Sequence, residues 1–133
     1  MYLLLLGGLL LLWATLFRIV KKASRRLRRQ AAENKHLALH DGLTDLPNRT
    51  LFHDRIEQAI LTAERENTSL GVVIIDVDRF KEVNDTLGHR SGDLLLQQIG
   101  PRLQATVRES DTVARLGGDE FGVLLPKVAD RRS

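Results

Sequence analysis

The 133-residue sequence contains no cysteine, so neither disulfide bonds nor a cysteine-based zinc site can be present. It also contains no internal repeat. Acidic and basic residues are unevenly distributed: residues 1–40 carry eight Lys or Arg and one acid, whereas residues 41–133 carry twelve basic and sixteen acidic residues. An acidic globular part lacks the basic face that general nucleic-acid binding needs. We therefore expect no nucleic-acid partner.

Residues 1–17 contain no charged side chain and are dominated by leucine. This run reaches the lower limit for a membrane-spanning helix, and Ile19 and Val20 extend it if the Arg18 side chain snorkels. The basic residues that follow predict a cytoplasmic location for the rest of the chain, and they have the charge to hold anionic lipid headgroups. A cleaved signal peptide is the competing interpretation, but it needs charge before the run and a small-residue cleavage site after it. We therefore predict a transmembrane anchor over residues 1–20.

Residues 18–40 contain neither proline nor glycine and are rich in good helix formers. Leu27, Ala31, Asn34 and Leu37 fall on one helical face. The pattern is typical of a short coiled-coil stalk or of a solvated linker helix, and the few apolar positions leave both open. We assign residues 21–40 to a basic juxtamembrane stalk and residues 41–133 to one domain.

The first half of this domain predicts a helix followed by a strand. Turn-forming residues at 41–49 precede a helix that Asn48 or Thr50 can cap and that ends near Glu66 and Asn67. Residues 70–77 form a continuous apolar run with β-branched neighbours, which is typical of a buried central strand.

The second half predicts two helices and a β-hairpin. Residues 79–88 are predicted to form a short helix that ends at Gly88. A longer helix is predicted to begin at Ser91 or Asp93, and Pro101 should kink or break it. The sequence predicts two strands joined by a tight turn, at residues 112–116 and 121–125. The order of elements predicts an α+β fold, with helices layered on a mainly antiparallel sheet.

Four carboxylates mark the ends of the predicted strands. Asp76 and Asp78 close the apolar strand, and Asp119 and Glu120 follow the two glycines of the hairpin turn. If the hairpin lies beside the apolar strand, these acids meet and can bind one or two Mg²⁺ ions that hold a triphosphate. Taken alone, either pair is explained equally well by capping of a loop or helix.

Polar residues after Asp76 have the chemistry of nucleotide recognition. Lys81 can meet a phosphate, while the Asn84 amide and the Asp93 carboxylate suit the carbonyl edge and the paired N–H donors of guanine. Each of them alone is more commonly an exposed polar residue or a helix cap. His89 has no second histidine nearby to complete a zinc site, and we group it with the substrate-binding candidates.

Three segments together resemble the GGDEF domain of bacterial diguanylate cyclases: residues 41–49 (DGLTDLPNR), residues 76–93 (DVDRFKEVNDTLGHRSGD) and residues 115–121 (RLGGDEF). The resemblance implies a fold similar to the palm of nucleotide cyclases and polymerases. It implies condensation of two GTP molecules into cyclic di-GMP, with release of pyrophosphate and with Mg²⁺ or Mn²⁺ as cofactor. For the anchored chain it implies the bacterial inner membrane, with the catalytic domain in the cytoplasm.

The resemblance also implies roles for individual residues. Asp76, the Val77 carbonyl, Asp119 and Glu120 would bind the metal, and Asp119 or Glu120 would help to deprotonate the attacking 3′-hydroxyl. The substrate would be bound by the following residues: Phe80, Lys81, Asn84, His89, Asp93, Gly117 and Gly118. Two such domains, each holding one GTP, would face each other in a homodimer. Arg108 and Asp111 match the family's Arg-x-x-Asp site, where cyclic di-GMP binds as an inhibitor; a helix-end ion pair is the alternative.

The family domain continues well past the hairpin, so we expect this chain to be an incomplete fragment with apolar faces left uncovered. Two other functions stay open. The chain can be a non-catalytic GTP-binding regulatory domain of a protein that also carries a cyclic di-GMP phosphodiesterase domain, or a membrane adaptor without enzymatic activity.

Overall fold

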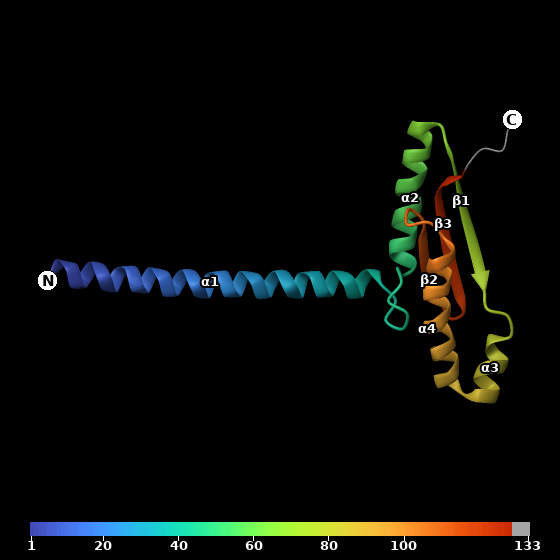
Figure 1. Cartoon of the computed structure of the whole chain (residues 1–133), viewed down its shortest axis with the longest axis horizontal. Helices are drawn as coiled ribbons and strands as arrows, with labels where there is room; N and C mark the ends of the chain where they lie inside the picture. Colours follow the sequence, from blue (N-terminus) through green and yellow to red (C-terminus); the bar gives the residue numbers. More distant parts are fainter. Residues whose placement is uncertain (129–133) are drawn as a thin grey trace. The chain divides into compact units, whose positions relative to one another are not determined.

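The structure is a computed structural model that describes residues 1–128, apart from the side chains of residues 2–6. The chain divides into two units, residues 1–38 and residues 39–133, and each is described by itself. The predicted end of the domain at residue 133 lies outside the described residues. The elements follow one another along the chain (Figure 1) as α1 (Tyr2–Leu39), α2 (Arg49–Glu66), β1 (Ser69–Asp76), α3 (Phe80–Leu87), α4 (His89–Thr106), β2 (Thr112–Gly117) and β3 (Glu120–Val128).

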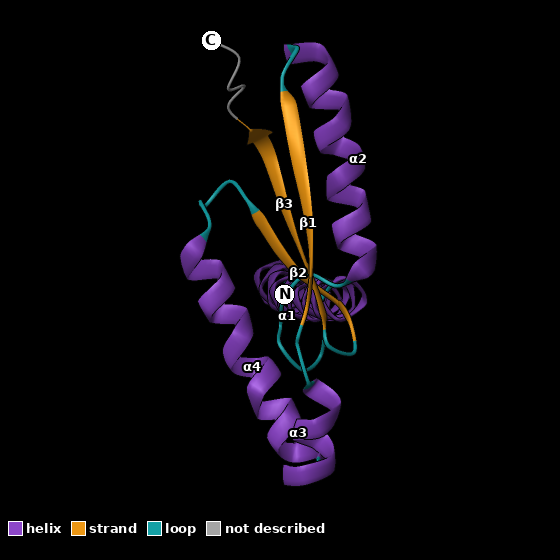
Figure 2. Cartoon of the chain, turned by 90° about the vertical axis from the view of Figure 1, so that its right-hand side faces the viewer, coloured by secondary structure: helices purple, strands orange, loops and turns teal. Residues whose placement is uncertain are grey.

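The three described strands form one antiparallel sheet in the order β1-β3-β2 (Figure 2). The predicted α+β class and the antiparallel hairpin are confirmed. The prediction of a buried central strand over residues 70–77 is wrong for the described sheet, because β1 lies at its edge and β3 lies in the middle. An apolar run shows that both faces of a strand are apolar, but it does not show how many neighbours the strand has.

The outer side of β1 leaves apolar side chains uncovered. Val72, Val73 and Ile74 are 43%, 44% and 57% exposed, respectively. An edge strand with such side chains offers unpaired backbone groups and apolar surface at the same place. The expectation of uncovered apolar surface therefore holds for this strand.

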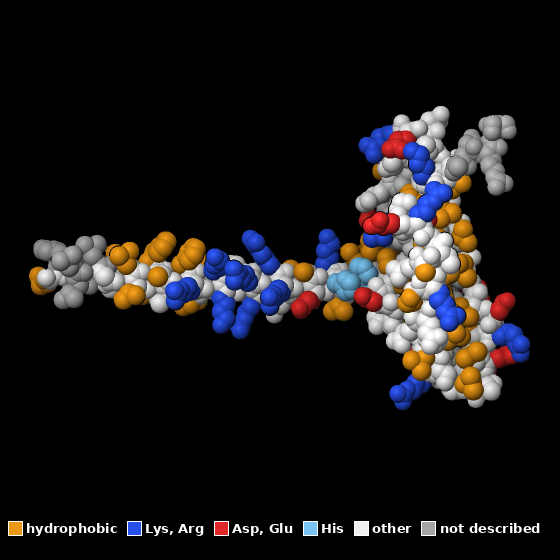
Figure 3. All heavy atoms as spheres, in the orientation of Figure 1, with side chains coloured by type: hydrophobic (Ala, Val, Ile, Leu, Met, Phe, Trp, Pro, Cys, Tyr) orange, Lys and Arg blue, Asp and Glu red, His pale blue; other side chains and the backbone are white. Residues whose placement is uncertain are grey.

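Helix α1 runs through both the predicted anchor and the predicted stalk without interruption. Trp13 stacks on Phe17 with ring centroids 5.5 Å apart, and the Lys21 ammonium lies 5.8 Å from the Phe17 ring centroid. Lys and Arg side chains project from the middle of the helix (Figure 3). Among the residues whose side chains are described, no helix has a long enough apolar stretch to cross a membrane. This finding does not cover residues 2–6, whose side chains are not described, so the anchor over residues 1–20 stays a prediction.

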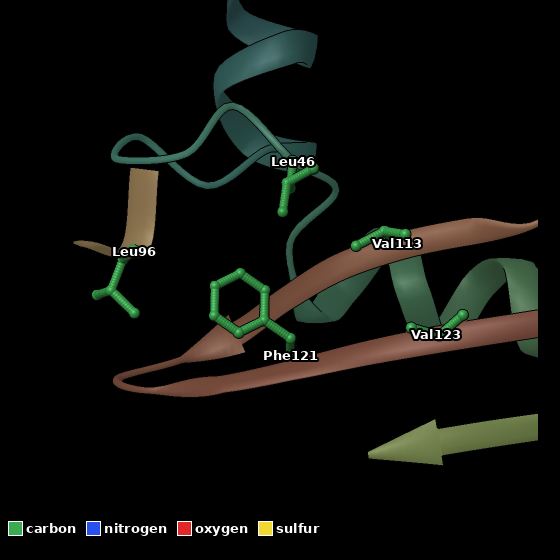
Figure 4. Packing of buried hydrophobic residues seen from close by; sticks show 5 residues of the cluster. All are labelled: Leu46, Leu96, Val113, Phe121 and Val123. Atoms are coloured by element: carbon green, nitrogen blue, oxygen red, sulfur yellow. The ribbon is translucent and has the colours of Figure 1, made fainter. Parts of the chain in front are cut away.

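Helices cover both faces of the sheet (Figure 2). On one face α2 packs its Phe52 and Ala59 side chains against Ala114 of β2 and Leu124 of β3. On the other face a cluster gathers from the loop before α2, from α4 and from both hairpin strands (Figure 4): Leu46, Leu96, Val113, Phe121 and Val123. The alternation of side chains along β2 and β3 supplies both clusters. Burial of Phe121 or Leu96 contributes roughly 1.5–3 kcal/mol each to folding.

Helix α2 agrees with its prediction at both ends. The Asn48 side chain caps the helix by accepting a hydrogen bond from the Leu51 N–H at 3.1 Å. Asn67 ends it in the left-handed conformation, at φ 52°. Phe52 lies so close to β3 that a Cβ at Gly122 would be 2.7 Å from its ring. Glycine at that position therefore lets α2 approach the sheet.

Helices α3 and α4 agree with their predictions in part. Helix α3 ends at Gly88 as expected. Helix α4 begins at His89, two residues before the predicted Ser91, and it continues through Pro101 to Thr106. Of the two predicted outcomes at Pro101, a kink or a break, the break does not occur. Proline removes only one hydrogen bond from the helix, and the packing of Leu96, Ile99 and Leu103 against the core holds both sides of it in place.

Candidate active site

The hairpin turn is built on two glycines with positive φ. Gly117 has φ 139° and Gly118 has φ 52°, and a Cβ added at either would meet nothing within 4 Å. The glycines are thus required by the backbone conformation rather than by lack of space. They leave the turn without side chains for two residues, immediately before Asp119 and Glu120.

The structure brings the two acidic segments together. Asp76, the last residue of β1, is directly opposite Glu120, the first residue of β3. The Val77 N–H donates a hydrogen bond to the Asp119 carbonyl oxygen at 3.1 Å. Residues directly opposite in an antiparallel pair share one face of the sheet. Asp76 and Glu120 therefore stand side by side, as the spacing of the motifs led us to expect.

Within the part of the chain that the structure describes, no three acidic or histidine side chains are close enough together to hold a metal ion. The donors that do meet have suitable chemistry. Asp76 is exposed and Glu120 half-buried, and the Val77 carbonyl accepts one hydrogen bond from the Phe80 N–H at 3.3 Å, which leaves a lone pair. Carboxylate and carbonyl oxygens are the ligands that Mg²⁺ prefers. The residues present therefore fit a divalent ion in donor type.

Arg49, the first residue of α2, reaches this corner of the sheet. Its guanidinium lies 3.5 Å from the Glu120 carboxylate, and its Nε donates to the Leu116 carbonyl oxygen at 3.0 Å. Sequence reasoning gave Arg49 no role, because 67 residues separate it from Leu116. Its place at the end of the DGLTDLPNR motif, directly after a helix cap, was the available signal.

Arg115 ties the hairpin turn to the loop before α2. Its Nη1 donates to both carboxylate oxygens of Asp41, at 2.9 and 3.0 Å, and its Nη2 donates to the Gly118 carbonyl oxygen at 2.7 Å. The two side chains are only 13% and 19% exposed. Asp41 also accepts hydrogen bonds from the Thr44 N–H and hydroxyl at 2.9 and 2.7 Å.

Opposing effects act on the pKa of Asp41. Partial burial raises it, but the hydrogen bonds from Thr44 and the charge and hydrogen bonds of Arg115 together hold the pKa below the usual aspartate value. Asp41 therefore stays ionised and keeps its pair with Arg115 in mildly acidic solution. Neither residue was among the predicted site residues, since the two are 74 positions apart in the sequence.

The predicted substrate-binding residues lie on α3 and the start of α4, which continue from the acidic end of β1. Phe80 and Lys81 form the first turn of α3, and Asn84 follows one turn later. His89 and Asp93 are exposed on the first turn and a half of α4. Asn84 is half-buried, and its Oδ1 is buried without a hydrogen-bond partner.

The predicted inhibitory pair lies at the far end of β2 from the glycine turn. The Arg108 N–H donates to the Asp111 carboxylate at 2.8 Å, and the Asp111 N–H donates to the Arg108 carbonyl oxygen at 3.0 Å. A cavity of about 270 Å³ adjoins this turn, and Val107, Arg108, Asp111 and Lys127 contribute to its wall. The pair therefore forms a tight turn beside an open cavity, at the opposite end of β2 from the corner where Asp76 meets Glu120.

The described fold and site define an α+β domain whose β-hairpin presents a Gly-Gly-Asp-Glu turn beside a strand that ends in aspartate. A family model described as "Diguanylate cyclase, GGDEF domain" matches residues 38–133. The chain belongs to this family.

Curated relatives agree with this assignment. The diguanylate cyclase TpbB of Pseudomonas aeruginosa (strain UCBPP-PA14) is 51% identical over 104 residues, which cover 78% of this chain and 24% of TpbB. The bifunctional diguanylate cyclase/cyclic di-GMP phosphodiesterase MucR of P. aeruginosa is 54% identical over 99 residues, which cover 74% of this chain and 14% of MucR. The chain thus spans a quarter or less of the length of these relatives.

Solved structures show the same fold. The GGDEF domain of TpbB from P. aeruginosa matches with a TM-score of 0.66 and 53% identity, over 68% of this chain and 53% of that one. The coiled coil and GGDEF domain of DgcB from Caulobacter crescentus, in complex with c-di-GMP, matches with a TM-score of 0.77 and 31% identity, over 85% of this chain and 60% of that one.

Proposed function

We propose that this chain carries the metal-binding and guanine-binding part of a diguanylate cyclase, which condenses two GTP molecules into cyclic di-GMP and releases pyrophosphate. The observation that carries the proposal is the pairing of Asp76 with Glu120, beside the hydrogen bond from the Val77 N–H to the Asp119 carbonyl oxygen. The 51% identity to TpbB, a named diguanylate cyclase, supports it.

In this proposal Asp76, Asp119, Glu120 and the Val77 carbonyl hold Mg²⁺ or Mn²⁺. The bound ion supplies positive charge that offsets the charge developing on the α-phosphate. Asp119 or Glu120 accepts the proton of the attacking 3′-hydroxyl. The catalytic work of the chain is then mainly positioning, because an in-line attack on phosphorus depends on alignment.

The remaining residues bind the nucleotide. The Asn84 amide and the Asp93 carboxylate bind the guanine edge, with His89 close by at the start of α4. Lys81 and the backbone at Phe80 contact the phosphates at the beginning of α3. Gly117 and Gly118 leave room for the nucleotide at the turn, where a Cβ would meet nothing within 4 Å. Each domain holds one GTP, so the reaction requires two copies that face each other.

Arg108 and Asp111 form the proposed binding site for cyclic di-GMP as an inhibitor. The solved DgcB structure, in complex with c-di-GMP, supports binding of this dinucleotide by a domain of this fold. The guanidinium of Arg108 is exposed beside the cavity and can bind a guanine edge or a phosphate through two parallel hydrogen bonds.

A regulatory GTP-binding domain is the second candidate, because the bifunctional MucR is 54% identical to this chain. Incubation of the chain with GTP and Mg²⁺, followed by chromatography of the nucleotides, separates the two functions. We expect cyclic di-GMP and pyrophosphate as products, and their loss in Glu120→Gln. Metal-dependent GTP binding without any product would favour the regulatory function, and absence of GTP binding would contradict both.

A further inference from the structure

Helix α4 approaches α3 at Gly92, which is buried in the second turn of α4. A Cβ at position 92 would overlap the Asn84 Oδ1 atom and would lie 3.0 Å from Asn84 Cγ and 3.2 Å from Phe80 Cζ. Gly92 has ordinary helical geometry, so the backbone does not require glycine there. The requirement is one of space: only a residue without a side chain lets α4 close on these two side chains.

At this contact the Asn84 amide turns its oxygen toward Gly92. Among the described residues, Asn84 Oδ1 is the only buried side-chain nitrogen or oxygen atom without a hydrogen-bond partner. This oxygen points at the Gly92 backbone. The amide nitrogen is therefore the end left to meet a ligand, and it can only donate hydrogen bonds.

A hydrogen-bond donor at this position distinguishes guanine from adenine. The six-position of guanine carries a carbonyl oxygen, which accepts a hydrogen bond from an amide nitrogen, whereas the six-position of adenine carries an amino group, which donates. An amide held with its nitrogen toward the base therefore favours guanine and disfavours adenine. A freely rotating amide would offer its oxygen to adenine equally well and would lose this preference.

We propose that Gly92 is a positioning residue for base specificity: the absence of its side chain lets α4 hold the Asn84 amide with its nitrogen toward the base. The inference rests on the proposed function, because it assumes that Asn84 meets the guanine. It adds that selectivity for GTP over ATP depends on a residue that does not itself contact the nucleotide.

The test compares GTP and ATP affinities, in the presence of Mg²⁺, of the wild-type chain, Gly92→Ala, Asn84→Ala and the double variant. We expect Gly92→Ala to lower the ratio of GTP to ATP affinity at least tenfold. It should add nothing further in the Asn84→Ala background, because both changes remove the same oriented donor. A merely structural defect would weaken both nucleotides equally.

Gly100→Ala is the matched control. Gly100 is also buried in α4, but a Cβ there would meet Leu46 Cδ1 at 3.2 Å, on the core side of the helix. We expect it to keep the wild-type affinity ratio, and circular dichroism shows whether both variants stay folded. An unchanged ratio in Gly92→Ala, or additive effects in the double variant, overturns the inference alone. A wild-type chain that does not prefer GTP, or whose preference survives Asn84→Ala, overturns the base-binding part of the proposed function as well.

Discussion

At the scale of single residues, the corner of the sheet where Asp76 meets Glu120 is next to a positively charged side chain, that of Arg49. The Arg49 guanidinium lies 3.5 Å from the Glu120 carboxylate, in the region where the proposed metal would bind. A guanidinium and a divalent ion cannot both bind the same carboxylate oxygen without repelling each other. If the proposed metal binds here, Arg49 therefore competes with it electrostatically when no nucleotide is bound.

Replacement of Arg49 by alanine should strengthen Mn²⁺ binding to the nucleotide-free chain. The Arg49 and Glu120 side chains are 60% and 46% exposed, so the pair contributes at most about 1 kcal/mol and the expected gain is about fivefold or less at low salt. Electron paramagnetic resonance of free Mn²⁺ measures the affinity directly.

Lys127→Ala is the control for this experiment, because it removes another exposed ion pair of 3.5 Å, with Glu66, away from the hairpin turn. It should leave Mn²⁺ affinity unchanged. Equal or weaker Mn²⁺ binding in Arg49→Ala would show that the guanidinium does not compete with the metal.

At the scale of elements, the Asp41–Arg115 pair connects the loop before α2 to the hairpin turn. Arg115 reaches Asp41 on one side and the Gly118 carbonyl oxygen on the other. The backbone supports the same connection, since the Arg115 N–H donates to the Pro47 carbonyl oxygen at 3.0 Å. The conformation of the acidic turn thus depends on a loop that begins about 70 residues earlier in the chain.

Asp41→Asn should destabilise the domain by about 2 kcal/mol at pH 7, because hydrogen bonds to charged groups contribute roughly 1.5–3 kcal/mol. The folded pKa of Asp41 lies below the unfolded one, so its contribution is complete above the unfolded pKa of about 3.9. The contribution is lost as the pH falls through the folded pKa. Urea unfolding at a series of pH values checks this, and a difference between the two proteins that persists at the lowest pH would contradict it.

The exposed edge of strand β1 leads us to predict self-association of the chain in solution. Ile74 is 57% exposed on an edge strand, a combination that favours association between copies. Ile74→Lys should reduce self-association of the 133-residue chain in light scattering. Ile60→Lys, at a 42% exposed position on α2, should have a smaller effect. Equal behaviour of the two variants would mean that the edge of β1 is not the surface that associates.

At the scale of the whole molecule, the sequence correctly predicted the ends of elements that local chemistry determines. Asn48, Asn67, Gly88 and the paired glycines of the turn mark ends that depend on capping or on positive φ, and the structure has them where expected. The edge position of β1 was not predictable, because strand order depends on pairing between residues far apart in the chain.

The residues of the candidate site also fall into those that were predicted from the sequence and those that were missed. Asp76, Asp119 and Glu120 were found from their spacing, since strand ends and a glycine turn place them near one another. Arg49 and Arg115 were missed, because their partners lie 67 and 74 residues away and nothing in the local sequence indicates such a contact. The membrane anchor was inferred from a leucine-rich run, and the described residues give it no support.

The central claim is that Asp76 and Glu120 bind the same divalent ion. Mn²⁺ affinities of the wild-type chain, Asp76→Asn, Glu120→Gln and the double variant, each with GTP present, test it most directly, with Asp85→Asn as an exposed acidic control on α3. We predict that each single change weakens Mn²⁺ binding at least tenfold, that the double change costs clearly less than the two effects combined, and that Asp85→Asn has little effect. Independent, additive losses at the two positions, or no loss at either, would contradict a shared metal site.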